Sequence, residues 1–171
     1  QKSKFIRRIF GSAELTRGLV RYCLWIDDCN LDEAMKIAGI SQRIEGVRAV
    51  RLASKDSGAN DMARRSHQMR EMNISQDLAI IVPRTSTENR LFLPCGLINH
   101  ENTVTSEAFA LFDAPIWSMA LIASTMHRIW IATVCGKMRI HYRYSNTIGW
   151  NTFPVPLLTE QNKADLTACA E

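Results

Sequence analysis

Residues 136–144 read Gly-Lys-Met-Arg-Ile-His-Tyr-Arg-Tyr and alternate basic with apolar side chains. Successive side chains of a β-strand point to opposite faces, so this period predicts one strand with a basic face and an apolar face. The outward row is Lys137, Arg139, His141 and Arg143. The inward row is Met138, Ile140, Tyr142 and Tyr144. Solvated faces usually mix charges of both signs, so an all-basic row favours an anionic partner, with a solvent-facing row as the simpler alternative.

The charge is unevenly distributed along the 171 residues. Residues 1–70 carry 14 Lys and Arg against 8 Asp and Glu, a net charge of +6, whereas residues 71–171 carry 7 against 9, a net charge of −2. A chain of this length buries enough surface to fold as one domain without disulfides. The asymmetry predicts a polyanion-facing side built from the first part and the basic strand.

Apolar runs along the chain predict a mixed architecture. Residues 77–83 and 89–98 read as strands joined by a polar turn at 84–88, and residues 102–111 add a third. Residues 114–134 predict a buried helix capped by Asp113 and broken near Ser124. We therefore expect an α+β fold with antiparallel sheet and a buried helix pair, in one compact domain that can divide into two lobes.

Residues 41–56 have a helical period. Ile44, Val47, Val50 and Ala53 are expected to face the core, whereas Arg48, Arg51 and Lys55 fall on one outward face. The following residues 57–66, rich in Gly, Asn and Asp with two adjacent arginines, predict a basic loop.

The sequence lacks familiar catalytic and metal-binding motifs. Its eight glycines are too widely spaced for a nucleotide-binding loop, and no Pro-Pro pair of the amino-methyltransferase signature occurs. The five cysteines form no Cys-x-x-Cys pair, which suggests reduced thiols in a cytoplasmic protein. No apolar run is long enough to span a membrane. We therefore predict no catalytic residue and no metal site in this chain.

A composite motif near the end of the chain is far more specific than any single short motif. It combines M-H-x-x-W, G-[RK]-[LM]-x-x-x-Y-R-Y-S and N-x-F-P-x-P. The matching residues are Met126, His127, Trp130, Gly136, Lys137, Met138, residues 142–145, Asn151, Phe153, Pro154 and Pro156. With the segments around residues 21–26, 47–56 and 80–98, this pattern closely resembles the target recognition domain of MmeI-like type II restriction-modification enzymes and related class I DNA methyltransferases.

The resemblance implies a module that reads double-stranded DNA for an adenine-specific methyltransferase, with residues 1–156 as the recognition domain and 157–171 as the start of a helical extension. The catalytic domain, which uses S-adenosylmethionine, would belong to the same polypeptide but lie outside this chain, which needs no cofactor of its own. In many relatives an N-terminal nuclease is fused to the same chain. The absence of an initial Met agrees with a piece of a longer protein.

The resemblance also implies which side chains contact DNA. Base-reading positions correspond to Arg139, His141 and Arg143, with Thr105 and Glu107 as a weaker second region. Backbone contacts are expected from Arg48, Arg51, Ser54, Lys55 and Lys137.

Two other functions are compatible with the residues. The aromatic strand could dock a protein partner, in which case binding would depend little on salt, whereas DNA binding would weaken steeply as salt rises. A hydrolase using Cys95 with His100 is the third hypothesis, although a small buried cysteine in a Pro-Cys-Gly turn is the commoner explanation.

Overall fold

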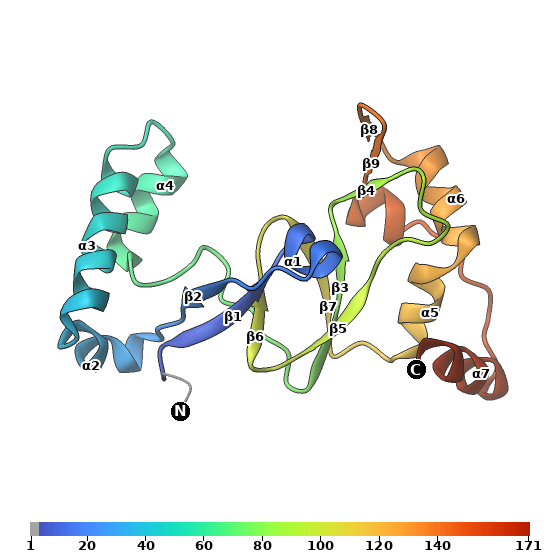
Figure 1. Ribbon diagram of the computed structural model, residues 1–171, viewed down its shortest axis with the longest axis horizontal. Coiled ribbons are helices and arrows are strands. Elements are labelled where there is room, and N and C mark those ends of the chain that lie inside the picture. Colours follow the sequence, from blue (N-terminus) through green and yellow to red (C-terminus); the bar gives the residue numbers. More distant parts are fainter. Residues whose placement is uncertain (1–3) are drawn as a thin grey trace. The chain divides into compact units, whose positions relative to one another are not determined.

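A computed structural model describes residues 4–171 and shows a mixed α/β fold with antiparallel sheets, as predicted (Figure 1). The chain divides into two compact units. The first comprises residues 4–8 and Tyr22–Asn73, and the second comprises Ile9–Arg21 and Ile74–Glu171. The two lobes that the sequence allowed are therefore present.

The first unit is mainly helical. Its elements are β2 (Tyr22–Leu24), η1 (Asp28–Asn30), α2 (Leu31–Met35), α3 (Ala38–Leu52), α4 (Ser57–Asp61) and η2 (Met62–Arg65), together with the start of β1 (Ile6–Phe10). Ile6 of β1 pairs antiparallel with Leu24 of β2. The core gathers residues from α2, from α3 and from the chain next to β1 and β2. It consists of Phe5, Ile26, Ala34, Ile40 and Ile44.

The predicted loop and the predicted core-facing row of α3 are both wrong. Residues 57–65 of the predicted loop 57–66 are helical, because the Asp56 carboxylate caps α4 by accepting from the Gly58 and Ala59 amides. Val47 and Val50 do not reach the core, since their side chains remain 40% and 73% exposed. Only one row of α3 is buried, at Ile40 and Ile44, because its neighbours cover a single side of the helix.

The second unit contains the remaining elements. They are α1 (Ser12–Arg17), β3 (Leu78–Pro83), β4 (Thr85–Thr87), β5 (Gly96–Asn99), β6 (Asn102–Val104), β7 (Ala108–Phe112), α5 (Trp117–Ala123), α6 (Thr125–Val134), β8 (Lys137–Met138), β9 (His141–Arg143), η3 (Asn146–Trp150) and α7 (Glu160–Ala170). Strand β3 pairs antiparallel with both β5 and β7. Helix α7 packs beside α5 (Figure 1).

Strand β3 lies between two apolar cores. Ile80 and Val82 belong to a cluster with Ile122 and Ile131 of the helix pair, whereas Ala79 and Ile81 point to the opposite cluster. Burial on both faces explains why this strand is a continuous apolar run rather than an alternating one.

The predicted break in the helix pair is confirmed at Ser124, whose Oγ accepts from the His127 amide and caps α6. Asp113 has a different role from the predicted helix cap. Its carboxylate accepts from the Gln76 and Asp77 amides, and its backbone has φ 51°. These backbone hydrogen bonds lower the pKa of the Asp113 carboxyl below its ordinary value.

The polar segment 84–88 is more than a turn between two strands. Its residues Thr85–Thr87 form β4, which pairs with β9, and of residues 89–98 only those from Gly96 onward are in a strand. The antiparallel pairing of the two predicted strands is confirmed by β3 and β5. The prediction of a simple turn between them is wrong, because β4 pairs with a strand more than 50 residues later in the chain.

Candidate functional site

Residues 137–143 form a β-hairpin rather than one strand. Lys137 pairs with Tyr142 and Met138 with His141, which leaves Arg139 and Ile140 as a two-residue turn. Strand β9 also pairs with β4, so the sheet order is β4-β9-β8. Arg139 has φ 58°, a left-handed conformation that such turns require and that favours glycine.

The chain reversal changes the predicted faces. Directly paired residues share a face, so Met138 joins His141 and Arg143, and Lys137 joins Tyr142. Lys137 Nζ lies 5.2 Å from the Tyr142 ring centre and 3.2 Å from a carboxylate oxygen of Glu88. Met138 and Ile140 are therefore more than half exposed, contrary to prediction.

The predicted inward positions of Tyr142 and Tyr144 are confirmed, with 7% and 4% of their surfaces exposed. The Tyr144 amide donates to the Arg84 carbonyl. This contact continues the pairing of β9 with the 84–87 segment and holds His141 and Arg143 on the opposite, exposed face.

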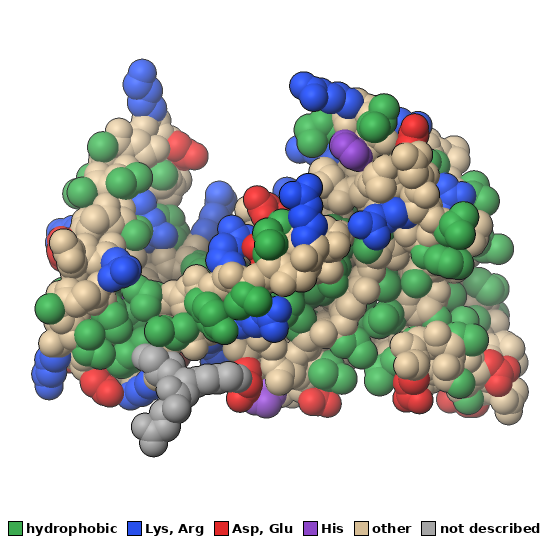
Figure 2. Space-filling model, in the orientation of Figure 1, with side chains coloured by type: hydrophobic (Ala, Val, Ile, Leu, Met, Phe, Trp, Pro, Cys, Tyr) green, Lys and Arg blue, Asp and Glu red, His purple; other side chains and the backbone are tan. Residues whose placement is uncertain are grey.

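These exposed side chains line a groove of about 650 Å³ within the second unit. Arginines from three segments reach it: Arg17 from α1, Arg84 and Arg90 flanking β4, and Arg143 from β9. Its remaining side chains are largely polar. They include Ser12, Thr16, Thr85, Ser86, Thr87, Ser106, Glu107 and His141. Figure 2 shows Lys and Arg side chains gathered on the part of this unit that carries α1 and the hairpin.

Glu107 of the weaker predicted region lines the same groove as His141 and Arg143, whereas Thr105 is not among its lining residues. Thr105 Oγ1 accepts from the Glu107 amide at 3.1 Å. Among the described residues that line the groove, Glu107 is the one carboxylate. Its carbonyl accepts from Ser12 Oγ at 2.5 Å and from the Arg84 amide at 3.0 Å.

Sequence reasoning missed the contributions of Arg17, Arg84 and Arg90. The Arg84 guanidinium lies 4.6 Å from the centre of the Phe109 ring, which holds the side chain between β4 and β7. Arg84 and Arg90 lie at the two ends of a polar segment, a feature that is visible in the sequence. The strand pairing that places this segment beside β9 is long-range and is not visible there.

The predicted cationic face of α3 is divided. The Arg48 side chain is 56% exposed, and its guanidinium nitrogen lies 4.0 Å from a carboxylate oxygen of Glu45. Lys55 is also exposed. Ser54 Oγ accepts from the Asp56 amide. Arg51 instead points at the following segment and donates to three backbone carbonyls, those of Met62, Arg65 and Gln68.

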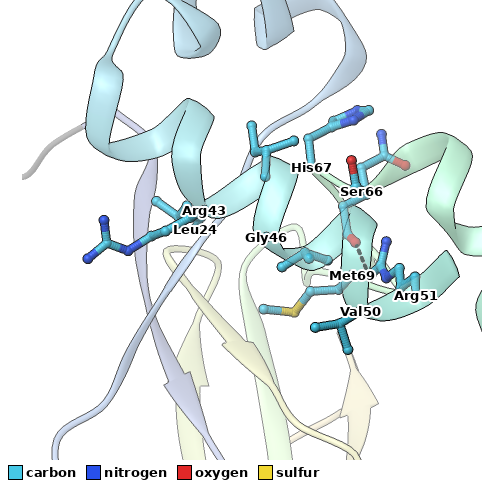
Figure 3. Close-up of a pocket in the computed structure, with 11 residues that line it drawn as sticks. Leu24, Arg43, Gly46, Val50, Arg51, Ser66, His67 and Met69 are labelled. Carbon is cyan, nitrogen blue, oxygen red and sulfur yellow. Dashed lines mark hydrogen bonds between the residues drawn. The ribbon is translucent and has the colours of Figure 1, made fainter. Parts of the chain in front are cut away.

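Figure 3 shows Arg51 bonded inside an apolar groove of the first unit, whereas Arg43 points away from it. The prediction that Arg51 faces outward with Arg48 and Lys55 is therefore wrong. A guanidinium offers five N–H donors in a fixed fork. Here it joins two carbonyls of η2 to the carbonyl of Gln68, three residues after that helix.

Cys95 is only partly accessible, and burial raises the pKa of its thiol to about 11. A thiol with a raised pKa is a poor nucleophile at neutral pH. Among residues 4–171, no group of three His, Cys, Asp or Glu side chains is placed to hold a metal ion. Over the same residues, no helix combines the length and apolar character needed to cross a membrane.

A groove lined by four arginines and by several hydroxyl side chains is electrostatically suited to an anionic ligand. The family described as "MmeI, target recognition domain" matches residues 1–157, and the chain belongs to this family.

The chain is 30% identical over 162 residues to DNA methyltransferase A of Bacillus subtilis (strain 168), which covers 95% of this chain and 18% of that protein. It also resembles the type IIL restriction-modification enzyme MmeI, solved in complex with DNA, with 27% identity and a TM-score of 0.92. That likeness covers 98% of this chain and 22% of the enzyme. The chain thus spans about a fifth of the length of either relative.

Proposed function

We propose that this chain is the recognition module of a DNA methyltransferase or restriction-modification enzyme and that it reads the sequence of double-stranded DNA. The observation that carries the proposal is the convergence of His141, Arg143 and Glu107 on one groove within a domain of the MmeI target recognition family. The identity and structural likeness to a DNA methyltransferase and to a DNA-bound restriction-modification enzyme support it.

The hairpin supplies the base-reading side chains in this proposal. A two-stranded β-ribbon fits the major groove, where an arginine makes two hydrogen bonds to guanine O6 and N7. Arg139 at the tip and His141 and Arg143 on the exposed face take this role, while Glu107 can accept from a cytosine or adenine amino group. The hydroxyls and arginines around them suit contacts with phosphates, which set register without reading sequence.

Arg48, Ser54, Lys55 and Lys137 are proposed to contact the DNA backbone. Arg51 is an exception, because its guanidinium is occupied by three carbonyls. We propose that it supports the segment after α3 instead of binding phosphate.

The methyltransferase domain is proposed to belong to the same polypeptide and to act on an adenine amino group, using S-adenosylmethionine. The residues of this chain do not fit that cofactor, since the sequence has no glycine-rich cradle. Recognition would hold the duplex while the adenine is flipped into the catalytic domain.

Genome-wide sequencing of modified sites tests the proposal in cells expressing the full-length polypeptide. Replacing Arg143 or His141 with Ala should relax the modified sequence at one or two base pairs. Loss of a two-hydrogen-bond contact costs about 1–3 kcal/mol at that pair, or roughly 5- to 150-fold. Arg70→Ala, a change in an exposed side chain of the first unit, is the matched control.

Tyr142→Ala should act differently, since loss of a buried ring costs about 3–5 kcal/mol of stability. An unaltered recognition sequence in the fully active Arg143 and His141 variants would refute the proposal. Absence of salt-dependent DNA binding, together with association to a protein that does not weaken as salt rises, would instead favour a protein-docking role.

A further inference from the structure

An ion pair between a buried glutamate and a half-exposed arginine lies next to the carboxylate of the groove. The Glu14 side chain is 5% exposed and accepts from the Gly11 amide at 2.8 Å. Arg21 contacts both carboxylate oxygens of Glu14, with Nε 3.1 Å from Oε1 and a terminal nitrogen 3.1 Å from Oε2. Burial raises the pKa of Glu14, but the backbone hydrogen bonds and the charge of Arg21 outweigh it, and the net shift is downward.

The same terminal nitrogen of Arg21 lies 3.6 Å from Oε2 of Glu107. The backbone of Glu107 is fixed separately, through its hydrogen bonds to Ser12, Arg84 and Thr105. Because the backbone is fixed, the Glu107 side chain has few orientations available. The contact with Arg21 favours one of them.

Gly11 makes room for this arrangement. A Cβ at this position would lie 2.6 Å from Thr105 Oγ1, 2.8 Å from Glu107 Oε2 and 2.9 Å from Glu14 Oε2. The backbone at Gly11 has φ −131°, which any residue adopts, so the close approach and not the conformation requires glycine.

The charges leave Glu107 able to accept hydrogen bonds. Two carboxylates share one guanidinium, which gives the cluster a net charge of −1, and the bidentate contact commits Arg21 mainly to Glu14. Glu107 itself is 60% exposed. An accessible carboxylate that is held in one direction is suited to accept from an exocyclic amino group.

We propose that Arg21, locked by Glu14, is a positioning residue that orients Glu107 to select a base pair presenting an amino donor, cytosine N4 or adenine N6. This inference rests on the proposed function and assigns specificity to two residues that need not touch a base.

The test compares Glu107→Gln, Arg21→Gln and Glu14→Gln in the full-length polypeptide, with Arg70→Gln as the control. Competition binding with duplexes altered at each recognised position gives the discrimination ratio at every base pair, and thermal unfolding is measured in parallel. We expect all three variants to lose about tenfold in discrimination at the same single pair. The double variant Arg21→Gln/Glu107→Gln should lose no more than Glu107→Gln alone.

Gly11→Ala provides a second perturbation that keeps every charge, and it should reduce discrimination at that same pair. An Arg21→Gln variant that weakens all sequences equally would overturn the inference, since Arg21 would then be a phosphate contact. An Arg21→Gln variant that lowers the unfolding temperature without changing discrimination would also overturn it. If Arg143→Ala alters recognition while the Glu107, Arg21 and Glu14 variants do not, the proposed function stands and this inference fails. If none alters recognition, both fail.

Discussion

Nε2 of His127 lies 3.3 Å from the hydroxyl oxygen of Tyr144, and both side chains are buried. The Phe153 ring packs edge-on against His127, with ring centres 4.5 Å apart. The three residues come from the three parts of the composite motif, so the motif describes one aromatic cluster that anchors α6 and the hairpin to each other. Its members support the candidate site without lining it.

Acid should destabilise the protein through His127. Burial lowers the pKa of its imidazole from 6.5 to about 4. Between these values the unfolded chain binds a proton that the folded chain does not, so stability is complete above about pH 6.5 and falls as the pH approaches 4. The loss is of order 3 kcal/mol. Urea unfolding at several pH values measures it.

His127→Gln should flatten this pH dependence and lower stability at neutral pH, because the aromatic contacts are lost. His141→Gln, at an exposed position of the hairpin, is the matched histidine control. A slope that persists in the His127 variant would assign the effect to another group.

Arg139→Gly should separate stability from recognition. Glycine adopts φ 58° without the roughly 1 kcal/mol cost that other residues incur, although it also adds entropy to the unfolded chain. We expect an unfolding temperature equal to or above that of the parent, together with altered sequence preference. A marked drop in unfolding temperature would show that the Arg139 side chain stabilises the hairpin.

Arg51→Ala should destabilise the first unit by roughly 2 kcal/mol, because three carbonyls lose a charged donor. Arg48→Ala should leave the free energy of unfolding nearly unchanged, since its one ion pair is exposed. In the full-length polypeptide Arg48→Ala should instead weaken binding to all sequences and lower the salt slope by about one unit. Chemical unfolding and salt titrations distinguish the two residues, and equal effects on stability would contradict this division.

Cys95 should react slowly with thiol reagents. Desolvation raises the pKa of its thiol to about 11, so little thiolate exists at pH 8, whereas Cys29 and Cys169 are exposed. Peptide mapping after timed alkylation should show the two exposed cysteines modified first. Rapid modification of Cys95 would revive the thiol-hydrolase hypothesis.

Local sequence patterns correctly predicted the elements whose conformation depends mainly on neighbouring residues in the chain. The apolar run of β3 and the break at Ser124 are of this kind, and Tyr142 and Tyr144 are buried as their spacing indicated. The hairpin turn at Arg139 could not be predicted from the sequence, because a left-handed turn position is usually occupied by Gly or Asn and not by a basic residue.

The groove and the Arg51 contacts depend on distant partners. Arg17 and Arg84 are far apart in sequence, and the carbonyls that bind Arg51 lie 11 to 17 residues later. No short window contains both halves of such an arrangement. The family resemblance indicated that the regions around residues 105–107 and 139–143 share a function, and the structure shows Glu107 and Arg143 lining one groove.

The hairpin turn between Met138 and His141 has two residues, and β4 fixes the register of β9 from its other edge. A substitution at 139, 141 or 143 changes the exposed chemistry and leaves Tyr142 and Tyr144 in the core. An insertion or deletion of one residue in β9 would exchange the two faces and turn a tyrosine toward solvent. The exposed face of the hairpin therefore tolerates substitutions at residues 139, 141 and 143, but not insertions or deletions in β9.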